Sequence, residues 1–248
     1  MTNPELASTL LATTLVLLFP LAAPFERRIY RSAPTTMVKL MVYSATMAVL
    51  WTLTAAAVRI GGWRPMLQSP SVGTPWLPAP AIVGPVLGLA VAVFLAVALA
   101  PLAQSLRGPR WRRAYAAAVR RGFADIPGFL PDTAIERRTF ILVSLTAGVC
   151  EEVLFRGFLI RFLTEHGPAV PLVGALLLSS AAFGLGHLYQ GFKGVVAATV
   201  GGVAFGLLFL LTGSLIPGII LHALVDAQMV FVLGPSPESD GAQPAALA

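Results

Sequence analysis

The sequence predicts an all-α protein, a polytopic transmembrane helix bundle. Hydrophobic residues make up 56% of the 248 residues and charged residues only 11%, whereas a soluble domain carries about 25% charged residues. So few charged side chains cannot cover the surface of a soluble globule of this size. A single cysteine, Cys150, excludes a disulfide-stabilised scaffold.

Seven hydrophobic segments are each long enough to cross the ~30 Å apolar layer of a bilayer. They cover residues 6–23, 37–58, 81–103, 139–163, 169–188, 194–211 and 215–233. We therefore expect about seven membrane spans. The first segment lacks the basic start of a secretory signal, so we expect it to be retained. The pairs Gly84-xxx-Gly88 and Gly202-xxx-Gly206 are typical of helix-packing faces.

Lysine and arginine gather in two connectors, and this predicts the orientation of the chain. The first connector carries Arg27, Arg28, Arg31 and Lys39 and the third carries eight arginines, whereas the second has only Arg59 and Arg64. Because basic loops stay on the cytoplasmic side, we expect the N-terminus outside and the C-terminus inside. We expect the plasma (inner) membrane of a prokaryote. These loops account for the net charge of +6, so we expect no nucleic-acid partner.

The third connector also predicts a short interfacial helix. Within it, residues 111–123 combine arginine pairs with Trp111, Tyr115, Val119 and Phe123 at helical spacing. Such a pattern is typical of an amphipathic helix that lies on the membrane surface. A solvated basic loop is the alternative.

Several polar residues occupy positions inside the hydrophobic segments, where each charged group costs about 2.5–3.5 kcal/mol. They are Glu151, Glu152, Arg156, His187, His222 and Asp226. Such groups usually face the interior of a bundle and serve a function. Helix-bridging hydrogen bonds are the structural alternative.

The spacing of these residues predicts which of them meet. Glu152 and Arg156 are four residues apart, in the order that favours an ion pair on one helix. Glu151 is rotated about 100° from Glu152 and is left without that partner. His222 and Asp226 are also four residues apart, so they face the same direction.

Together these residues resemble the three motifs of the CPBP intramembrane proteases, the CAAX prenyl endopeptidase and bacteriocin-processing group. The motifs are Glu151-Glu152-x-x-x-Arg156, with Phe155-Arg156-Gly157 around the arginine, then Phe183-x-x-x-His187, then His222-x-x-x-Asp226. The resemblance divides the chain into N-terminal spans with the basic connector (1–138), a catalytic helical core (139–233) and a disordered tail (234–248).

The resemblance implies an intramembrane endopeptidase in which Glu151 is the general base for an attacking water. His187 would help to hold that water, and His222 would donate to the oxyanion. Glu152 and Arg156 would support the helix and keep Glu151 aimed. A helix rises about 1.5 Å per residue, so Glu151 lies deep in the span that begins at residue 139 on the cytoplasmic side. We therefore expect a water-filled cavity that opens on the cytoplasmic side, with His187 at its mouth.

Asp226 departs from the family pattern, because many members carry asparagine at this position. An ionised aspartate accepts hydrogen bonds but does not donate them. Asp226 is therefore protonated, or orients His222, or binds a metal. Glu151, His187, His222 and Asp226 are a credible ligand set for zinc, but no H-E-x-x-H is present. We favour a mechanism that requires no cofactor, with zinc as the alternative.

The partners that the resemblance implies are the lipid bilayer and a peptide or protein substrate, prenylated or C-terminally anchored. A non-catalytic immunity or scaffold protein that binds a peptide is the main alternative. A transporter is a third, but we find no pair of related halves with broken helices.

Overall fold

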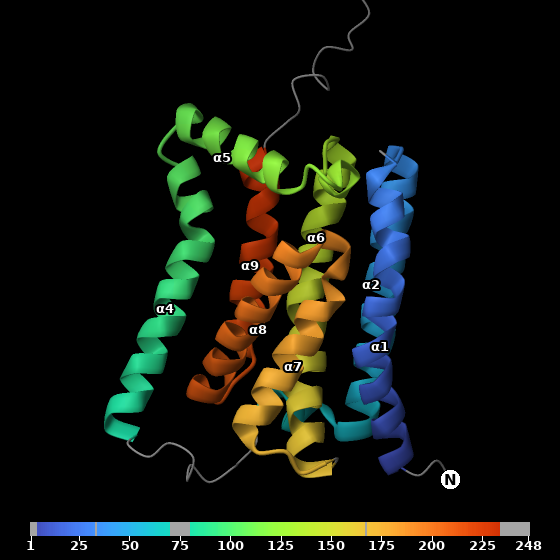
Figure 1. The fold of residues 1–248 in the computed structure, drawn as a ribbon, viewed down its shortest axis with the longest axis vertical. Helices are drawn as coiled ribbons and strands as arrows, with labels where there is room; N and C mark the ends of the chain where they lie inside the picture. Colours follow the sequence, from blue (N-terminus) through green and yellow to red (C-terminus); the bar gives the residue numbers. More distant parts are fainter. Residues whose placement is uncertain (1–3, 33, 70–79, 167, 234–248) are drawn as a thin grey trace, which may run out of the picture.

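Each hydrophobic segment of the sequence folds into a helix. The computed structural model describes residues 4–32, 34–69, 80–166 and 168–233. Its long helices are α1 (Pro4–Arg31), α2 (Thr36–Gly61), α4 (Pro80–Ser105), α6 (Ala134–Glu151), α7 (Leu172–Gly186), α8 (Phe192–Thr212) and α9 (Ile216–Leu233). They form an elongated bundle (Figure 1). The prediction of an all-α bundle is confirmed.

The predicted number of about seven spans is approximate. Five helices, α1, α2, α4, α8 and α9, are long and apolar enough to cross a membrane on their own. Helix α7 is apolar but has only 15 residues. Helix α6 continues into two π-helical segments, η2 (Glu152–Leu159) and η3 (Phe162–His166), and this stretch matches the segment predicted at 139–163.

The connectors differ from the prediction in detail. Helix α1 continues through its basic residues to Arg31, so the first connector is short. The second connector contains the short helix α3 (Trp63–Leu67). The rest of that connector (70–79) and the tail predicted to be disordered (234–248) lie outside the described residues.

The predicted amphipathic segment is helical. Helix α5 (Pro109–Gly122) has no buried residue and carries arginines at both ends. It runs across one end of the bundle, at a large angle to the long helices (Figure 1). It contacts α4 and α9. This geometry is that of a helix parallel to a membrane surface.

A buried ion-pair network joins the two basic connectors at this end of the bundle. The ammonium of Lys39 in α2 donates to the Leu130 carbonyl (2.8 Å), to Asp132 (2.9 Å) and to Glu136 (3.2 Å). Glu136 also completes a capping box with Thr133 at the start of α6. The first and third connectors therefore lie at one end, and the start of α1 lies at the other (Figure 1).

Three glycines allow helices to approach each other closely. A Cβ on Gly148 in α6 would lie 2.9 Å from the Ala223 backbone of α9, and one on Gly202 in α8 would lie 3.0 Å from Ser180 of α7. Gly206 likewise faces Leu176, so the Gly202-xxx-Gly206 face is confirmed. The prediction for Gly84 and Gly88 is not met within this bundle, since a Cβ on either would have no atom of another described segment within 4 Å.

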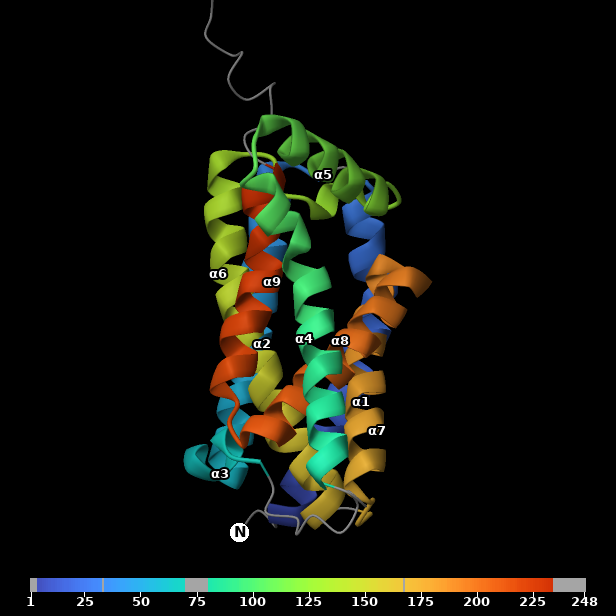
Figure 2. The same cartoon turned by 90° about the vertical axis from the view of Figure 1, so that its left-hand side faces the viewer.

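Helix α4 lies on the outside of the bundle, between α8 and α9 in the view of Figure 2. Its exposed side chains include Val86, Leu89, Val93 and Val97. Such a surface fits lipid. The helix reaches the bundle through Phe94, whose ring meets Phe205 of α8 edge-on at 6.0 Å.

Candidate active site

Glu151 and Glu152 lie where α6 changes to a π-helix. Glu151 is the last residue of α6, and the eight residues Glu152–Leu159 that follow are all buried. π-Helical turns are rare in proteins as a whole, and those that occur often lie at functional sites. The change occurs about halfway along the helical stretch 134–166, so two adjacent carboxylates lie deep in the bundle.

The His222 ring of α9 lies between these two carboxylates. Its Nδ1 is 2.8 Å from Glu152 Oε1, and its Nε2 is 3.7 Å from Glu151 Oε2. Nε2 is also 3.7 Å from Asp226 Oδ2. Because imidazole has nitrogens on two edges, one ring faces two side chains that diverge on the helix. The prediction that Glu151 and Glu152 point in different directions therefore agrees with the structure, but Glu151 is not isolated, because it faces His222.

The cluster is closed on one side and open on the other. The side chains of Glu152 and His222 are 0% and 5% exposed, whereas those of Glu151 and Asp226 are 17% and 37% exposed. The accessible side of the cluster is therefore the Nε2 edge of His222, between Glu151 and Asp226.

The ion pair expected between Glu152 and Arg156 is present. Arg156 donates to Glu152 Oε1 at 2.9 Å and to the Gly202 carbonyl of α8 at 3.2 Å. Its guanidinium lies 4.5 Å from the centroid of the Phe183 ring. Glu152 Oε1 therefore accepts from both Arg156 and His222. Glu152 therefore contacts His222 directly, in addition to the ion pair that was expected with Arg156.

Asp226 makes no direct hydrogen bond to His222. Its distance of 3.7 Å from Nε2 is too long for a hydrogen bond, whereas Glu152 accepts from the other nitrogen at 2.8 Å. In the structure, the hydrogen-bond partner of the His222 ring is therefore Glu152.

His187 lies beside this cluster at the end of α7. Its Nδ1 is 2.9 Å from the Phe183 carbonyl. A carbonyl only accepts, so Nδ1 carries the proton and Nε2 is left for water or substrate. The Phe183 ring contacts both histidine rings, at 4.7 Å from His187 and 5.8 Å from His222. The three motifs therefore meet around Phe183.

The residues considered as zinc ligands are not gathered in the described residues as three or more donors around one position. Within the described parts of the chain, no group of three or more His, Cys, Asp or Glu side chains is arranged to hold a metal ion. The Nδ1 atoms of His187 and His222 face the Phe183 carbonyl and Glu152.

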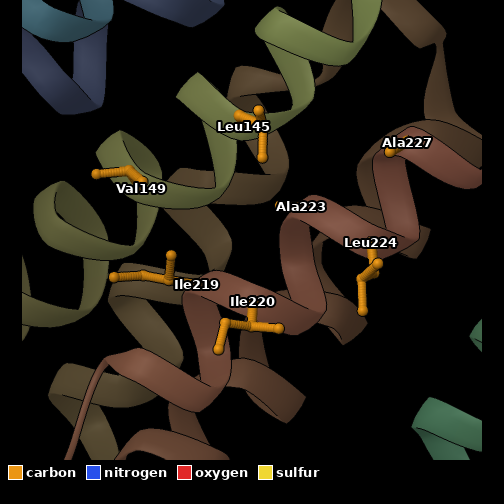
Figure 3. Close-up of a pocket in the computed structure, with 7 residues that line it drawn as sticks. All are labelled: Leu145, Val149, Ile219, Ile220, Ala223, Leu224 and Ala227. Atoms are coloured by element: carbon orange, nitrogen blue, oxygen red, sulfur yellow. The ribbon is translucent and has the colours of Figure 1, made fainter.

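An apolar pocket of about 250 Å³ lies between α6 and α9. Figure 3 shows its lining residues, Leu145, Val149, Ile219, Ile220, Ala223, Leu224 and Ala227. A second pocket lies near the start of α1 and includes Arg161. Neither pocket contains Glu151 or His187, so the cavity expected from the cytoplasmic side stays a prediction.

Phe205 of α8 is a site residue that the sequence did not reveal. Its ring lies flat against His222, with centroids 5.1 Å apart and planes 13° apart. It also lies 5.8 Å from the Arg156 guanidinium. A phenylalanine in a hydrophobic segment carries no polar signal. Its separation of three residues from Gly202, which packs against α7, is the feature that could have placed it on an inner face.

The fold and this cluster define a polytopic membrane protein with a polar site inside its helix bundle. Residues 135–228 match the family model described as type II CAAX prenyl endopeptidase Rce1-like. This segment contains all three motifs, and the match confirms the resemblance to the CPBP proteases. At the family level it supports a membrane protease. The match spans less than half of the 248 residues. Comparisons with curated proteins and with solved structures give no match.

Proposed function

We propose that this protein is an intramembrane endopeptidase that hydrolyses a peptide bond of a membrane-associated protein or peptide, with Glu151 as the base that activates water. The observation that supports this proposal most directly is the placement of the His222 ring. Glu152 holds one edge of the ring, and the other edge faces Glu151 and Asp226. The Rce1-like match of residues 135–228 supports the reaction class.

The reaction begins on the open side of the cluster. Glu151 takes a proton from water, and the oxygen attacks the carbonyl carbon of the scissile bond. His187 holds the water through Nε2, because its Nδ1 proton is directed to the Phe183 carbonyl. The product of this step is a tetrahedral intermediate with a negatively charged oxygen.

Collapse of the intermediate breaks the C–N bond. In its charged form, His222 donates Nδ1–H to Glu152 and presents Nε2–H to the oxyanion. Glu151 returns its proton to the leaving amine. Water is thus divided between a new carboxylate and a new amine, and the enzyme returns to its starting state without an oxidant or cofactor.

Asp226 faces the same open side and acts on water or substrate rather than on His222. An ionised Asp226 accepts a hydrogen bond from the attacking water or from the substrate amide. Its exposure of 37%, the highest of the cluster, supports this assignment.

The substrate class follows from the location of the cluster. Glu151 and Glu152 lie deep in a bundle whose outer surface is apolar, so a substrate reaches them from within or beside the bilayer. We propose a prenylated or C-terminally anchored peptide or protein, cleaved in a prokaryotic plasma membrane with the basic end of the bundle in the cytoplasm. Five helices that qualify as spans support the integral location.

A non-catalytic immunity or scaffold protein would use the same pocket to bind a peptide without cutting it. The experiment that separates the two compares the protein termini of cells that carry wild-type protein or Glu151→Gln at matched expression. Glu165→Gln is the control, because this carboxylate pairs with Arg161 on the surface. The enzyme predicts defined cleaved ends in the wild type and control that vanish in Glu151→Gln. Identical ends in all three strains, with a deletion phenotype rescued by Glu151→Gln, support binding instead.

A further inference from the structure

Phe205 contacts the His222 ring but belongs to none of the three motifs. The two rings are nearly parallel, with planes 13° apart and centroids 5.1 Å apart. Phe183 meets His222 edge-on instead, with an angle of 87° and a separation of 5.8 Å. Two aromatic rings from two different helices therefore define the space available to the imidazole.

The position of Phe205 is fixed by the backbone of α8. Gly206, its neighbour, allows α8 to lie so close to α7 that any side chain there would overlap Leu176. One turn earlier, a Cβ on Gly202 would lie 3.0 Å from Ser180 Cβ. The Phe205 side chain is itself 4% exposed. The ring consequently has little freedom to move away from His222.

A fixed ring plane matters because of what lies at the two imidazole edges. Rotation about the Cβ–Cγ bond of His222 would move Nε2 away from Glu151 and Asp226, each 3.7 Å from it. The hydrogen bond to Glu152 fixes the position of Nδ1, but by itself it leaves the plane of the imidazole ring free to tilt around that bond. A flat aromatic neighbour removes that tilt.

The geometry points to Phe205 as a positioning residue that holds the imidazole plane of His222, so that Nε2 stays directed at the reacting groups. This inference rests on the proposed function. Phe205 contacts no reacting atom and acts through His222. Its ring also contacts Phe94 of the outer helix α4.

The test replaces the ring and keeps the volume. Phe205→Met removes the aromatic plane, Phe205→Tyr keeps it, and Phe209→Met is the matched control. Phe209 is on the same helix one turn later, is 1% exposed and packs in the apolar core. The substrate is a farnesylated peptide ending in a CAAX sequence, with a fluorophore and a quencher on either side of the bond to be cut, in detergent micelles.

We expect Phe205→Met to lower kcat about 10- to 100-fold, as misplacement of a catalytic group does, with KM within twofold. Phe205→Tyr should keep at least a third of kcat, and Phe209→Met should keep it within twofold. Wild-type kcat in Phe205→Met overturns the inference. So does an equal loss in Phe209→Met, or a loss in Phe205→Tyr as large as that in Phe205→Met.

A second readout does not depend on cleavage. The chain has only three histidines, so ¹⁵N-imidazole NMR resolves His222, with a His222→Gln sample for assignment. The Nδ1–H signal of His222 should broaden in Phe205→Met and stay sharp in Phe209→Met; a sharp signal in both overturns the inference. If Glu151→Gln cleaves at the wild-type rate, the proposed function fails, and this spectrum still tests the positioning of the ring.

Discussion

Replacement of Glu152 by glutamine separates the structural and the catalytic roles of the buried cluster. Glu152 is 0% exposed, and its Oε1 accepts from Arg156 at 2.9 Å and from His222 at 2.8 Å. Removal of one partner of a buried ion pair costs about 3–5 kcal/mol. The Gly202 carbonyl and the Phe183 ring still contact Arg156, so we expect about 3 kcal/mol, the lower end of that range.

The double variant Glu152→Gln/Arg156→Met tests this reasoning. Replacement of both members of a buried ion pair by less polar groups is often nearly neutral, so the double variant should regain at least half of the lost stability. It should not regain cleavage. Without the carboxylate that accepts from Nδ1, His222 loses its orientation, which in a comparable histidine–carboxylate pair costs about 10⁴-fold in rate.

Both quantities are measured on the same samples. Unfolding in detergent micelles gives the free energy of unfolding, and the farnesylated CAAX peptide gives the cleavage rate. A loss of less than about 1 kcal/mol in Glu152→Gln would mean that the pair does not behave as a buried one. Recovery of cleavage in the double variant would refute the role of Glu152 in orienting His222.

Four further predictions concern the Lys39 network, Asp226 and the metal requirement. Lys39→Met leaves Glu136 without its cation and should cost about 3 kcal/mol in the free energy of unfolding, measured in micelles; a loss under 1 kcal/mol contradicts the network. Burial alone raises the pKa of Glu136, which precedes the hydrophobic segment of α6, but hydrogen bonds from Thr36 and the Asp132 backbone and the charge of Lys39 hold it below its usual value. The stability that this carboxylate contributes is therefore full above its unfolded pKa and is lost as the pH falls through the folded pKa, and an acid unfolding series should show this loss in wild type but not in Glu136→Gln. Asp226→Asn should keep at least a tenth of the cleavage rate, because an amide can donate to the oxyanion at this site; complete inactivity in a folded variant would assign Asp226 an essential charge. A chelator in the peptide assay should leave the rate unchanged, and a loss restored by zinc would reverse the preference for a metal-free mechanism.

The helices and the partners within each helix could be predicted from the sequence. Runs of hydrophobic residues mark the spans because the bilayer fixes their length. The pair Glu152–Arg156 follows from helical spacing alone. Long-range partners are different, since nothing in the spacing says that His222 of α9 meets both Glu151 and Glu152. That contact depends on Gly148, which allows α6 to touch Ala223.

The limits of the prediction also have physical causes. The angle between the Glu151 and Glu152 side chains was predicted for an α-helix. The change to a π-helix at Glu152 has no signature that we recognised in the sequence. Phe205 was missed because apolar residues in a membrane span look alike whether they face lipid or a catalytic ring. The prediction for Gly84 and Gly88 was not met within this bundle, because small residues on a lipid-facing helix follow the same spacing as a packing face.

The central claim is that water activated by Glu151 attacks the peptide bond. The most direct measurement is cleavage of the farnesylated CAAX peptide by purified protein in water enriched in ¹⁸O, followed by mass spectrometry of the new carboxyl terminus. Wild type and Glu165→Gln should place one ¹⁸O atom in each product, and Glu151→Gln should cleave about 10²- to 10⁴-fold more slowly, the contribution typical of a general base. Cleavage by Glu151→Gln at the wild-type rate would contradict the account.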